Sequence, residues 1–300
     1  MRVDWNNKYE VLDLVREGEY IKYASPELKD DKEFILEAVK NDGTNLCWAS
    51  DRLKNDKEFM MEIMKENGYA LEFALDKFKN DKDVILVAVK CSGNSLRCID
   101  EKFKNDKDVV MEAVKNDSYA LEFASDRLKN DKEIVLKAVK NHIEALQFAS
   151  PELKDDKDFM LKICKEHKYT STQFLSEKLK NDKEFAIKII NILGKNLEYL
   201  SPQIRDDKEV VLEAIKKDGW NFKYASDRLK NDREVVLEAV KKEASVIFYV
   251  DKKLKNDKEI VLEACKNDKS IFYLEDSLEE IRKEFETVED FLNSEKEKNI

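Results

Sequence analysis

The chain has 300 residues, of which 40% are charged and 42% hydrophobic, and its formal net charge is −10. Its six glycines and three prolines are too few for the tight turns of a β-sandwich or β-barrel, and no glycines cluster into a phosphate-binding loop. The acidic excess disfavours a general nucleic-acid-binding surface. A composition rich in Ala, Glu, Lys and Leu therefore indicates a mostly helical chain.

The N-terminal residues, MRVDWNNKYE, lack the apolar core of a secretory signal, and no stretch approaches the roughly 18 apolar residues of a membrane helix. The five cysteines are odd in number and scattered, which disfavours a disulfide framework and favours a reducing compartment. We therefore expect a cytoplasmic protein with no membrane association, unless it is delivered to a host cell without a classical signal peptide.

A motif of the type Asn-Asp-Lys-Glu recurs along the chain every 25 residues, with a single gap of 26. Its aspartates are Asp31, Asp56, Asp81, Asp106, Asp131, Asp156, Asp182, Asp207, Asp232 and Asp257. A fixed period of this length predicts stacked supersecondary units. We expect an all-α solenoid of about eleven helix–turn–helix repeats, with an N-terminal capping repeat (1–30), a repeat array (31–276), and a C-terminal capping helix and tail (277–300).

Residues 55–79 illustrate one repeat. Asn55 or Asp56 suits the N-cap of a helix, and the apolar residues between 59 and 64 cover more than one face of it, as expected for a helix packed between neighbours. Gly68 falls where a helix commonly stops, and a short second helix that includes Phe73 follows. All six glycines of the chain occupy the same slot, which indicates one register throughout.

The two ends depart from this pattern. The first repeat has a smaller apolar face, formed by Val11, Leu12, Leu14 and Val15. Near the other end, Ser277 and Glu280 match a capping box. This box predicts one longer helix with an apolar face formed by Leu278, Ile281, Phe285, Val288 and Leu292. We expect the tail from residue 295 to fray and the capped array to be a monomer.

The segment 120–141, ALEFASDRLKNDKEIVLKAVKN, resembles the repeats of the family called domain of unknown function 4116, and the resemblance extends from about Tyr20 to Tyr273. Repeats of that family are roughly 50 residues long, which equals two of the units counted above. The resemblance implies a tandem helical fold. It implies no activity, cofactor or catalytic residue.

Two kinds of ladder arise when one slot is filled alike in every repeat. Three lysine ladders begin at Lys29, Lys32 and Lys40 and could follow a phosphate backbone, but neighbouring acidic ladders and helix C-termini explain them more simply as solvated charges. An aromatic ladder is interpreted as the core of the second helix. Its members are Tyr23, Trp48, Phe73, Phe123, Phe148, Phe174, Tyr199, Tyr224, Tyr249 and Tyr273.

Candidate catalytic groups are few. The only histidines are His142 and His167, and Cys164 lies three residues before His167, as in half of a Cys-His pair or metal site. However, Cys164 occupies a slot filled by valine in other repeats, which favours a core position. We therefore expect no catalytic residue, no metal and no cofactor.

The residue after the glycine slot is aromatic in alternate repeats, at Tyr69, Tyr119, Tyr169 and Trp220. Stacking of 25-residue units does not require a 50-residue period, so these side chains are our candidate binding ridge, although packing on the adjacent loop is the alternative. Around Lys168 the chain gains one residue, and this irregular stretch is a second candidate.

The expected function is that of a non-enzymatic scaffold that binds a partner protein or peptide along an extended surface. Two alternatives remain. The chain could be an inhibitor or decoy of a host or defence protein, as encoded by phages and pathogens, or it could bind nucleic acid through its lysine ladders.

Overall fold

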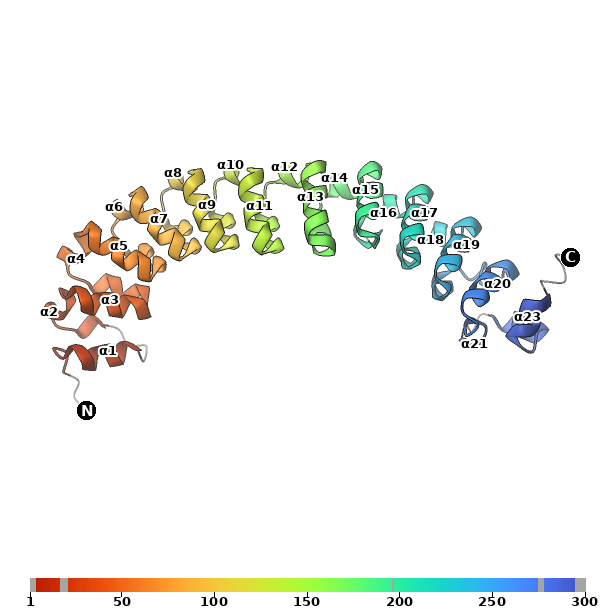
Figure 1. Cartoon of the computed structure of the whole chain (residues 1–300), viewed down its shortest axis with the longest axis horizontal. Helices are drawn as coiled ribbons and strands as arrows, with labels where there is room; N and C mark the ends of the chain where they lie inside the picture. Colours follow the sequence, from red (N-terminus) through yellow and green to blue (C-terminus); the bar gives the residue numbers. More distant parts are fainter. Residues whose placement is uncertain (1–3, 17–20, 196, 275–277, 295–300) are drawn as a thin grey trace. The chain divides into compact units, whose positions relative to one another are not determined.

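The computed structural model describes residues 4–16, 21–195, 197–274 and 278–294, with side chains for all of these except 16, 169, 170, 274, 279 and 280. Within these ranges the chain forms α-helices and 3₁₀-helices and no strand (Figure 1). It divides into two compact units, Met1–Leu153 and Lys154–Ile300. The predicted all-α solenoid of short helical repeats is thus the fold of the protein. None of the described helices is both long and apolar enough to span a bilayer.

Each repeat of unit 1 contains a short α-helix, a long α-helix and a 3₁₀-helix, in that order. The long helices are α1 (Lys8–Arg16), α3 (Lys32–Asn41), α5 (Lys57–Glu66), α7 (Lys82–Cys91), α9 (Lys107–Asn116) and α11 (Lys132–Asn141). The short ones are α2 (Pro26–Lys29), α4 (Asp51–Asn55), α6 (Asp76–Lys79), α8 (Glu101–Lys104), α10 (Asp126–Lys129) and α12 (Pro151–Lys154), whose last residue opens unit 2. The 3₁₀-helices are η1 (Ile21–Tyr23), η2 (Gly43–Trp48), η3 (Gly68–Phe73), η4 (Gly93–Cys98), η5 (Ser118–Phe123) and η6 (Ile143–Phe148).

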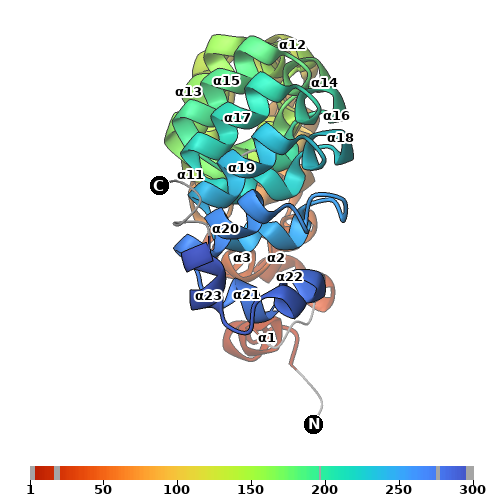
Figure 2. The same cartoon turned by 90° about the vertical axis from the view of Figure 1, so that its right-hand side faces the viewer.

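Unit 2 follows the same order, and Figure 2 shows its short helices along one side of its long ones. The long helices are α13 (Lys157–His167), α15 (Lys183–Leu193), α17 (Lys208–Lys217), α19 (Arg233–Lys242) and α20 (Lys258–Asn267). The short ones are α14 (Glu177–Lys180), α16 (Pro202–Arg205) and α18 (Asp227–Lys230). The 3₁₀-helices are η7 (Lys168–Phe174), η8 (Leu197–Tyr199), η9 (Gly219–Tyr224) and η10 (Ala244–Tyr249). The unit ends with α21 (Ile271–Leu274), α22 (Glu279–Glu284) and α23 (Val288–Ser294).

Within each unit, an interior long helix packs between the long helices of the repeats before and after it, as its wide apolar surface predicts. In unit 1, α9 contacts both α7 and α11, and in unit 2, α17 contacts both α15 and α19. Val109, Val110, Ala113 and Val114 of α9 are all fully buried. The N-cap is the aspartate of the repeated motif, not the asparagine before it, because Asp106 accepts hydrogen bonds from the first-turn N–H groups of its helix.

The second helix of the repeat is a 3₁₀-helix, whereas the sequence interpretation treated it as an ordinary helix. With three residues per turn, Gly68, Leu71 and Ala74 share one face, and all three are buried. Phe73 lies on a neighbouring face and is only half-buried. This geometry determines which side chains of the segment reach the surface.

Glycine recurs at this slot of the repeat for a reason other than the expected helix stop. Gly68 does not adopt a positive φ; instead, an added Cβ would lie 2.3 Å from the carbonyl oxygen of Ala88 in the next repeat. Glycine therefore permits close stacking of repeats. Among the described glycines, Gly194 in the irregular part of unit 2 has a positive φ, +78°, and nothing lies within 4 Å of its added Cβ.

The extra residue near Lys168 lengthens the first long helix of unit 2. Both α13 and α15 have 11 residues, whereas α9 has 10. Lys168 caps α13 with φ 53° and ψ −133°, which places a non-glycine residue in a sparsely populated backbone region. The sequence defect is thus a local change in helix length and backbone geometry.

The C-terminal cap consists of two short helices, and the prediction of one longer helix is wrong. The chain leaves α22 at Phe285, and Thr287 starts α23 through a capping box, in which the Thr287 N–H donates to Asp290 and the Asp290 N–H donates to the Thr287 hydroxyl. Helix α23 packs on α20 with Phe291 fully buried. Ser277, the side chain of Glu280 and the tail from residue 295 lie outside the described residues.

Candidate binding surface

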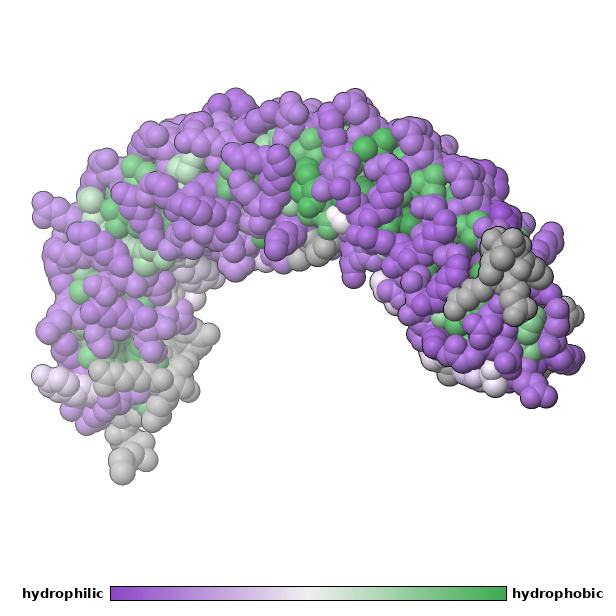
Figure 3. Space-filling model, turned by 45° about the vertical axis from the view of Figure 1, so that its right-hand side comes forward, coloured by the Kyte–Doolittle hydropathy of each residue, from purple (hydrophilic) through white to green (hydrophobic). Residues whose placement is uncertain are grey.

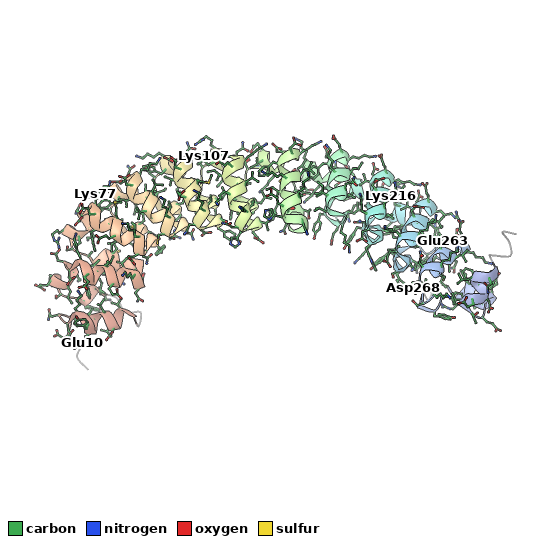
Figure 4. The ribbon with its side chains drawn as sticks, viewed as in Figure 1. Glu10, Lys77, Lys107, Lys216, Glu263 and Asp268 are labelled. Atoms are coloured by element: carbon green, nitrogen blue, oxygen red, sulfur yellow. The ribbon has the colours of Figure 1, made fainter. Side chains whose placement is uncertain are left out.

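One lysine ladder joins successive repeats. Lys32 Nζ lies 2.7 Å from a carboxylate oxygen of Asp56, the N-cap of the next long helix, and Lys82 lies 2.6 Å from Asp106 in the same way. The hydrogen bond from Lys32, followed by that from the Phe59 N–H, lowers the pKa of Asp56. The same contact recurs at Lys8–Asp31, Lys57–Asp81, Lys107–Asp131, Lys157–Asp182, Lys183–Asp207, Lys208–Asp232 and Arg233–Asp257. These cations are engaged within the stack, and Figure 4 shows Lys107 at the end of α9 that adjoins α8.

A second ladder, which includes Lys104 and Lys180, is partly buried. Lys104 is 17% exposed and binds Glu101 at 2.7 Å, and Lys180 binds Glu177 at the same distance. The backbone carbonyl of Lys104 accepts a hydrogen bond from the N–H of Ser125 in the next repeat, at 2.9 Å. This slot therefore also serves to connect repeats.

The third ladder lies near the C-terminal ends of the long helices and carries acidic partners one turn earlier. Lys216 binds Glu213 and Lys266 binds Glu263, each at 2.7 Å. Figure 4 labels Lys216 and Glu263 on their helices, and Figure 3 shows hydrophilic residues over most of the visible face. Each lysine line is thus accompanied by carboxylates, as the solvated-charge interpretation predicted.

The aromatic ladder is at the surface, and its interpretation as core is wrong. None of its members is buried: Tyr23 is 60% exposed, Trp48 37%, Tyr199 40% and Tyr273 57%, and the others are half-buried. The inner face of the 3₁₀-helices is occupied instead by smaller side chains such as Leu71. A three-residue spacing of small and apolar residues, Gly68–Leu71–Ala74, was the signal in the sequence that could have shown this.

The predicted ridge residues lie beside this ladder. Tyr69 and Tyr119 in unit 1 are each 39% exposed, and Trp220 in unit 2 is 38% exposed. Lys168 is exposed, and the side chain of Tyr169 lies outside the described part of the structure. Part of each ring packs on the repeat itself or on the next, as the loop-packing alternative expects, and the remainder faces solvent.

Ring contacts join the ridge to the ladder within each unit. The centroids of Tyr69 and Phe73 are 5.6 Å apart, those of Tyr119 and Phe148 are 6.3 Å apart, and those of Trp220 and Tyr249 are 6.4 Å apart. Consecutive 3₁₀-helices also contact one another from η1 to η6 and from η8 to η10.

We call this set of residues the aromatic surface. In unit 1 it comprises Tyr23, Trp48, Tyr69, Phe73, Tyr119, Phe123 and Phe148. In unit 2 it comprises Phe174, Tyr199, Trp220, Tyr224, Phe248, Tyr249 and Tyr273.

The rings of the aromatic surface already accept cations from their own chain. The Arg97 guanidinium lies 5.6 Å from the centroid of Tyr69, and Lys223 lies 5.6 Å from that of Tyr224 and 5.5 Å from that of Tyr249. Such contacts are attractive because the ring face carries partial negative charge. The surface therefore combines apolar area with sites that favour positive groups.

The thiol of Cys164, half of the Cys-His pair that the sequence disfavours, is not activated. Cys164 lies on the buried face of α13 and is fully buried, and burial raises the pKa of its thiol. No group of three or more His, Cys, Asp or Glu that could hold a metal occurs among the described residues. A pocket of about 420 Å³ beside α10 is lined mainly by polar side chains, with Phe148 as its aromatic wall.

Comparison with known proteins identifies the repeat. The family model described as domain of unknown function (DUF4116) matches residues 7–54, 31–79, 56–104, 81–129, 106–154, 131–170, 156–205, 207–255 and 235–285. Most of these overlapping matches start 25 residues apart, the spacing of the repeat found in the sequence. No curated protein and no solved structure matches the chain.

Proposed function

Since the chain belongs to the DUF4116 repeat family, whose function is unknown, we propose a function from its surface: a non-enzymatic repeat scaffold that binds a partner protein or peptide. The aromatic surface is the binding face in this proposal, with Tyr69, Tyr119 and Trp220 as its anchors. Tyr169 and Lys168, predicted from the sequence, are further candidates. The observation that carries this proposal is that, within each unit, half-exposed aromatic side chains lie on successive 3₁₀-helices.

Aromatic side chains supply most of the energy in many protein interfaces, because they bury a large area at a small entropic cost. A side chain such as Tyr119 retains two-fifths of its surface in solvent, and a partner that covers it would remove this apolar area from water. Several such rings in one row suit an extended peptide or a long interface, in which many moderate contacts add up.

The nucleic-acid alternative has less support. It requires lysines that are available to phosphates, whereas Lys32, Lys82 and their equivalents bind the aspartate of the next repeat. An inhibitor or decoy would use the same aromatic surface as a scaffold, and only the identity of the partner separates the two.

An affinity capture from a lysate of the source organism or its host, with and without nuclease, tests the proposal. We expect one nuclease-resistant protein to be enriched by the wild-type chain. The variant with Tyr69, Tyr119, Tyr169 and Trp220 all replaced by Ala should lose it, provided that circular dichroism shows an unchanged helix content. Tyr9→Ala is the matched control, because Tyr9 is 79% exposed but lies on α1, outside the aromatic surface.

Two results would contradict the proposal. One is a partner retained equally by the fourfold variant and the wild type. The other is captured material that is lost on nuclease treatment and whose affinity falls steeply with salt. That result would favour nucleic-acid binding through the lysine ladders.

A further inference from the structure

The five residues Tyr69–Phe73 and Tyr119–Phe123 have the same sequence, YALEF, and both lie in 3₁₀-helices of unit 1, η3 and η5. The two tyrosines are equally exposed, at 39%. The chain therefore presents the same local sequence twice, two repeats apart, and the repeat that follows each copy contributes a difference between them.

At the first copy, an arginine from the next repeat occupies this surface. The guanidinium of Arg97 lies over the ring of Tyr69, 5.6 Å from its centroid, and donates to a carboxylate oxygen of Glu72 at 2.5 Å. The hydrogen bond from Arg97 is the main cause that lowers the pKa of Glu72. Tyr69 and Glu72 together thus bind a guanidinium by stacking and by an ion pair.

At the second copy, the residue equivalent to Arg97 is Gln147, which carries no charge. Glu122 is exposed, and no ion pair of this carboxylate occurs within the described part of the chain. Glu144 stands where the first copy has Asn94, so this site has gained a carboxylate and lost a cation. It is therefore more acidic than the copy that binds arginine.

The aromatic part of the second copy is larger. Tyr119 lies 6.3 Å from Phe148, which replaces Cys98 of the first copy, and 5.7 Å from the ring of His142. Phe148 is half-buried, so its ring extends the aromatic platform of Tyr119. A planar guanidinium can stack on such rings while its N–H groups pair with a carboxylate, which the compact ammonium of lysine does less well.

We propose that Tyr119, Glu122, Glu144 and Phe148 form a binding site for an arginine side chain of the partner protein. This inference deepens the proposed function and rests on it, since it names the chemistry that one part of the aromatic surface recognises. The occupied copy at Tyr69 and Glu72 is the template for the contact.

The test is a titration of the full chain, labelled with ¹³C in its tyrosine rings, with N-acetyl-arginine amide as the probe and N-acetyl-citrulline amide as its uncharged isostere. The NMR signals of Tyr69 and Tyr119 are assigned by their loss in Tyr69→Phe and Tyr119→Phe. We expect the arginine probe to shift the Tyr119 signal more than the citrulline probe, with little change at Tyr69. Glu122→Gln should weaken the binding about two- to fivefold.

Reciprocal variants exchange the two copies. Gln147→Arg should place an arginine from the chain itself over Tyr119 and abolish its response to the probe. Arg97→Gln should free the first copy, so that Tyr69 begins to respond. Both positions are on the surface of 3₁₀-helices, and circular dichroism verifies that the variants are folded.

The proposal is overturned if the arginine probe does not shift the Tyr119 signal or if the citrulline probe shifts it equally. It is also overturned if the Tyr119 signal still shifts in Gln147→Arg, or if the Tyr69 signal does not shift in Arg97→Gln. These outcomes are separate from the capture experiment. A chain that binds arginine at Tyr119 but captures no protein would refute the scaffold function alone. A chain that captures a partner through the aromatic surface without an arginine response would refute this site alone.

Discussion

Asp106 offers a direct test of how the repeats are held together, because one side chain makes two kinds of contact. Its Oδ1 accepts hydrogen bonds from the N–H groups of Asp108 at 3.0 Å and Val109 at 3.3 Å, which cap α9. Its Oδ2 accepts from Lys82 Nζ of the preceding repeat at 2.6 Å. Asp106→Ala removes both contacts, whereas Asp106→Asn keeps a good capping group and removes the charge.

The two contacts contribute different amounts to the free energy of unfolding. Loss of an N-cap costs about 0.5–2 kcal/mol. The pair with Lys82 is solvent-accessible, since the lysine side chain is 41% exposed, so its loss costs about 0.2–1 kcal/mol. We therefore expect Asp106→Ala to lower the free energy of unfolding by about 1–3 kcal/mol and Asp106→Asn by less than about 1 kcal/mol. Asp108→Ala is the matched control for the cap. Asp108 is 82% exposed and lies 3.5 Å from the same lysine but does not cap the helix, so its loss should change stability by less than about 0.5 kcal/mol.

Urea unfolding monitored by circular dichroism at pH 7 measures these differences, and hydrogen exchange of the α9 amides shows whether the loss is local. The expected order is Asp106→Ala well below Asp106→Asn, with Asp108→Ala near wild type. If Asp106→Asn is as damaging as Asp106→Ala, the ion pair and not the cap dominates. If Asp106→Ala is neutral, the account of the repeat junction is refuted.

Three further predictions concern the stack. Gly68→Ala should cost about 1–3 kcal/mol through its clash with the Ala88 carbonyl, and Gly68→Asn should cost more. Gly194→Ala meets no neighbouring atom within 4 Å, so the strain of a positive φ is the only source of its cost, about 1–2 kcal/mol; urea midpoints measure both. Phe291→Ala should cost about 3–5 kcal/mol, because this ring is fully buried and packs on the rings of Phe272 and Phe285, and α23 should then be cut first in limited proteolysis. At constant ionic strength, the free energy of unfolding should fall as the pH drops below about 4. Aspartates in the unfolded chain bind protons with a pKa near 3.8, whereas the N-cap aspartates of the folded protein have a lower pKa. Protonation therefore favours the unfolded state. A melting temperature that is flat from pH 5 to pH 2.5 would contradict this.

Much of the fold could be predicted from the sequence, because stacking constrains the same slots in every repeat. The aspartate period located the start of the long helices, and the apolar surface of residues 59–64 predicted their position between neighbours. The second helix was harder. An α-helical and a 3₁₀ segment of six residues have similar composition, and only the three-residue spacing from Gly68 to Leu71 distinguishes them. The break at Phe285 was hidden because an apolar face can continue across two helices.

The candidate surface was predicted only in part. The ridge positions Tyr69, Tyr119 and Trp220 are half-exposed in the structure, but the ladder beside them was assigned to the core, because aromatic residues with a strict period usually are core. Its exposure depends on helix type, which is a property of geometry and not of residue type. The contact between Arg97 and Glu72 was also beyond sequence reasoning, since it depends on the rotamers of two long side chains in different repeats.

The chain has a 25-residue period, which stacking of the repeats requires, and a 50-residue period, which stacking does not require. Slots that join repeats, such as Asp106 with Lys82, recur every 25 residues, because every junction must be made. The ridge recurs every 50 residues in unit 1, at Tyr69 and Tyr119, although the junctions on which it lies are alike. Packing alone does not account for a period twice that of the fold. Descent from a double repeat and selection for binding both produce such a period, and the response of Tyr119 to the arginine probe tests the second.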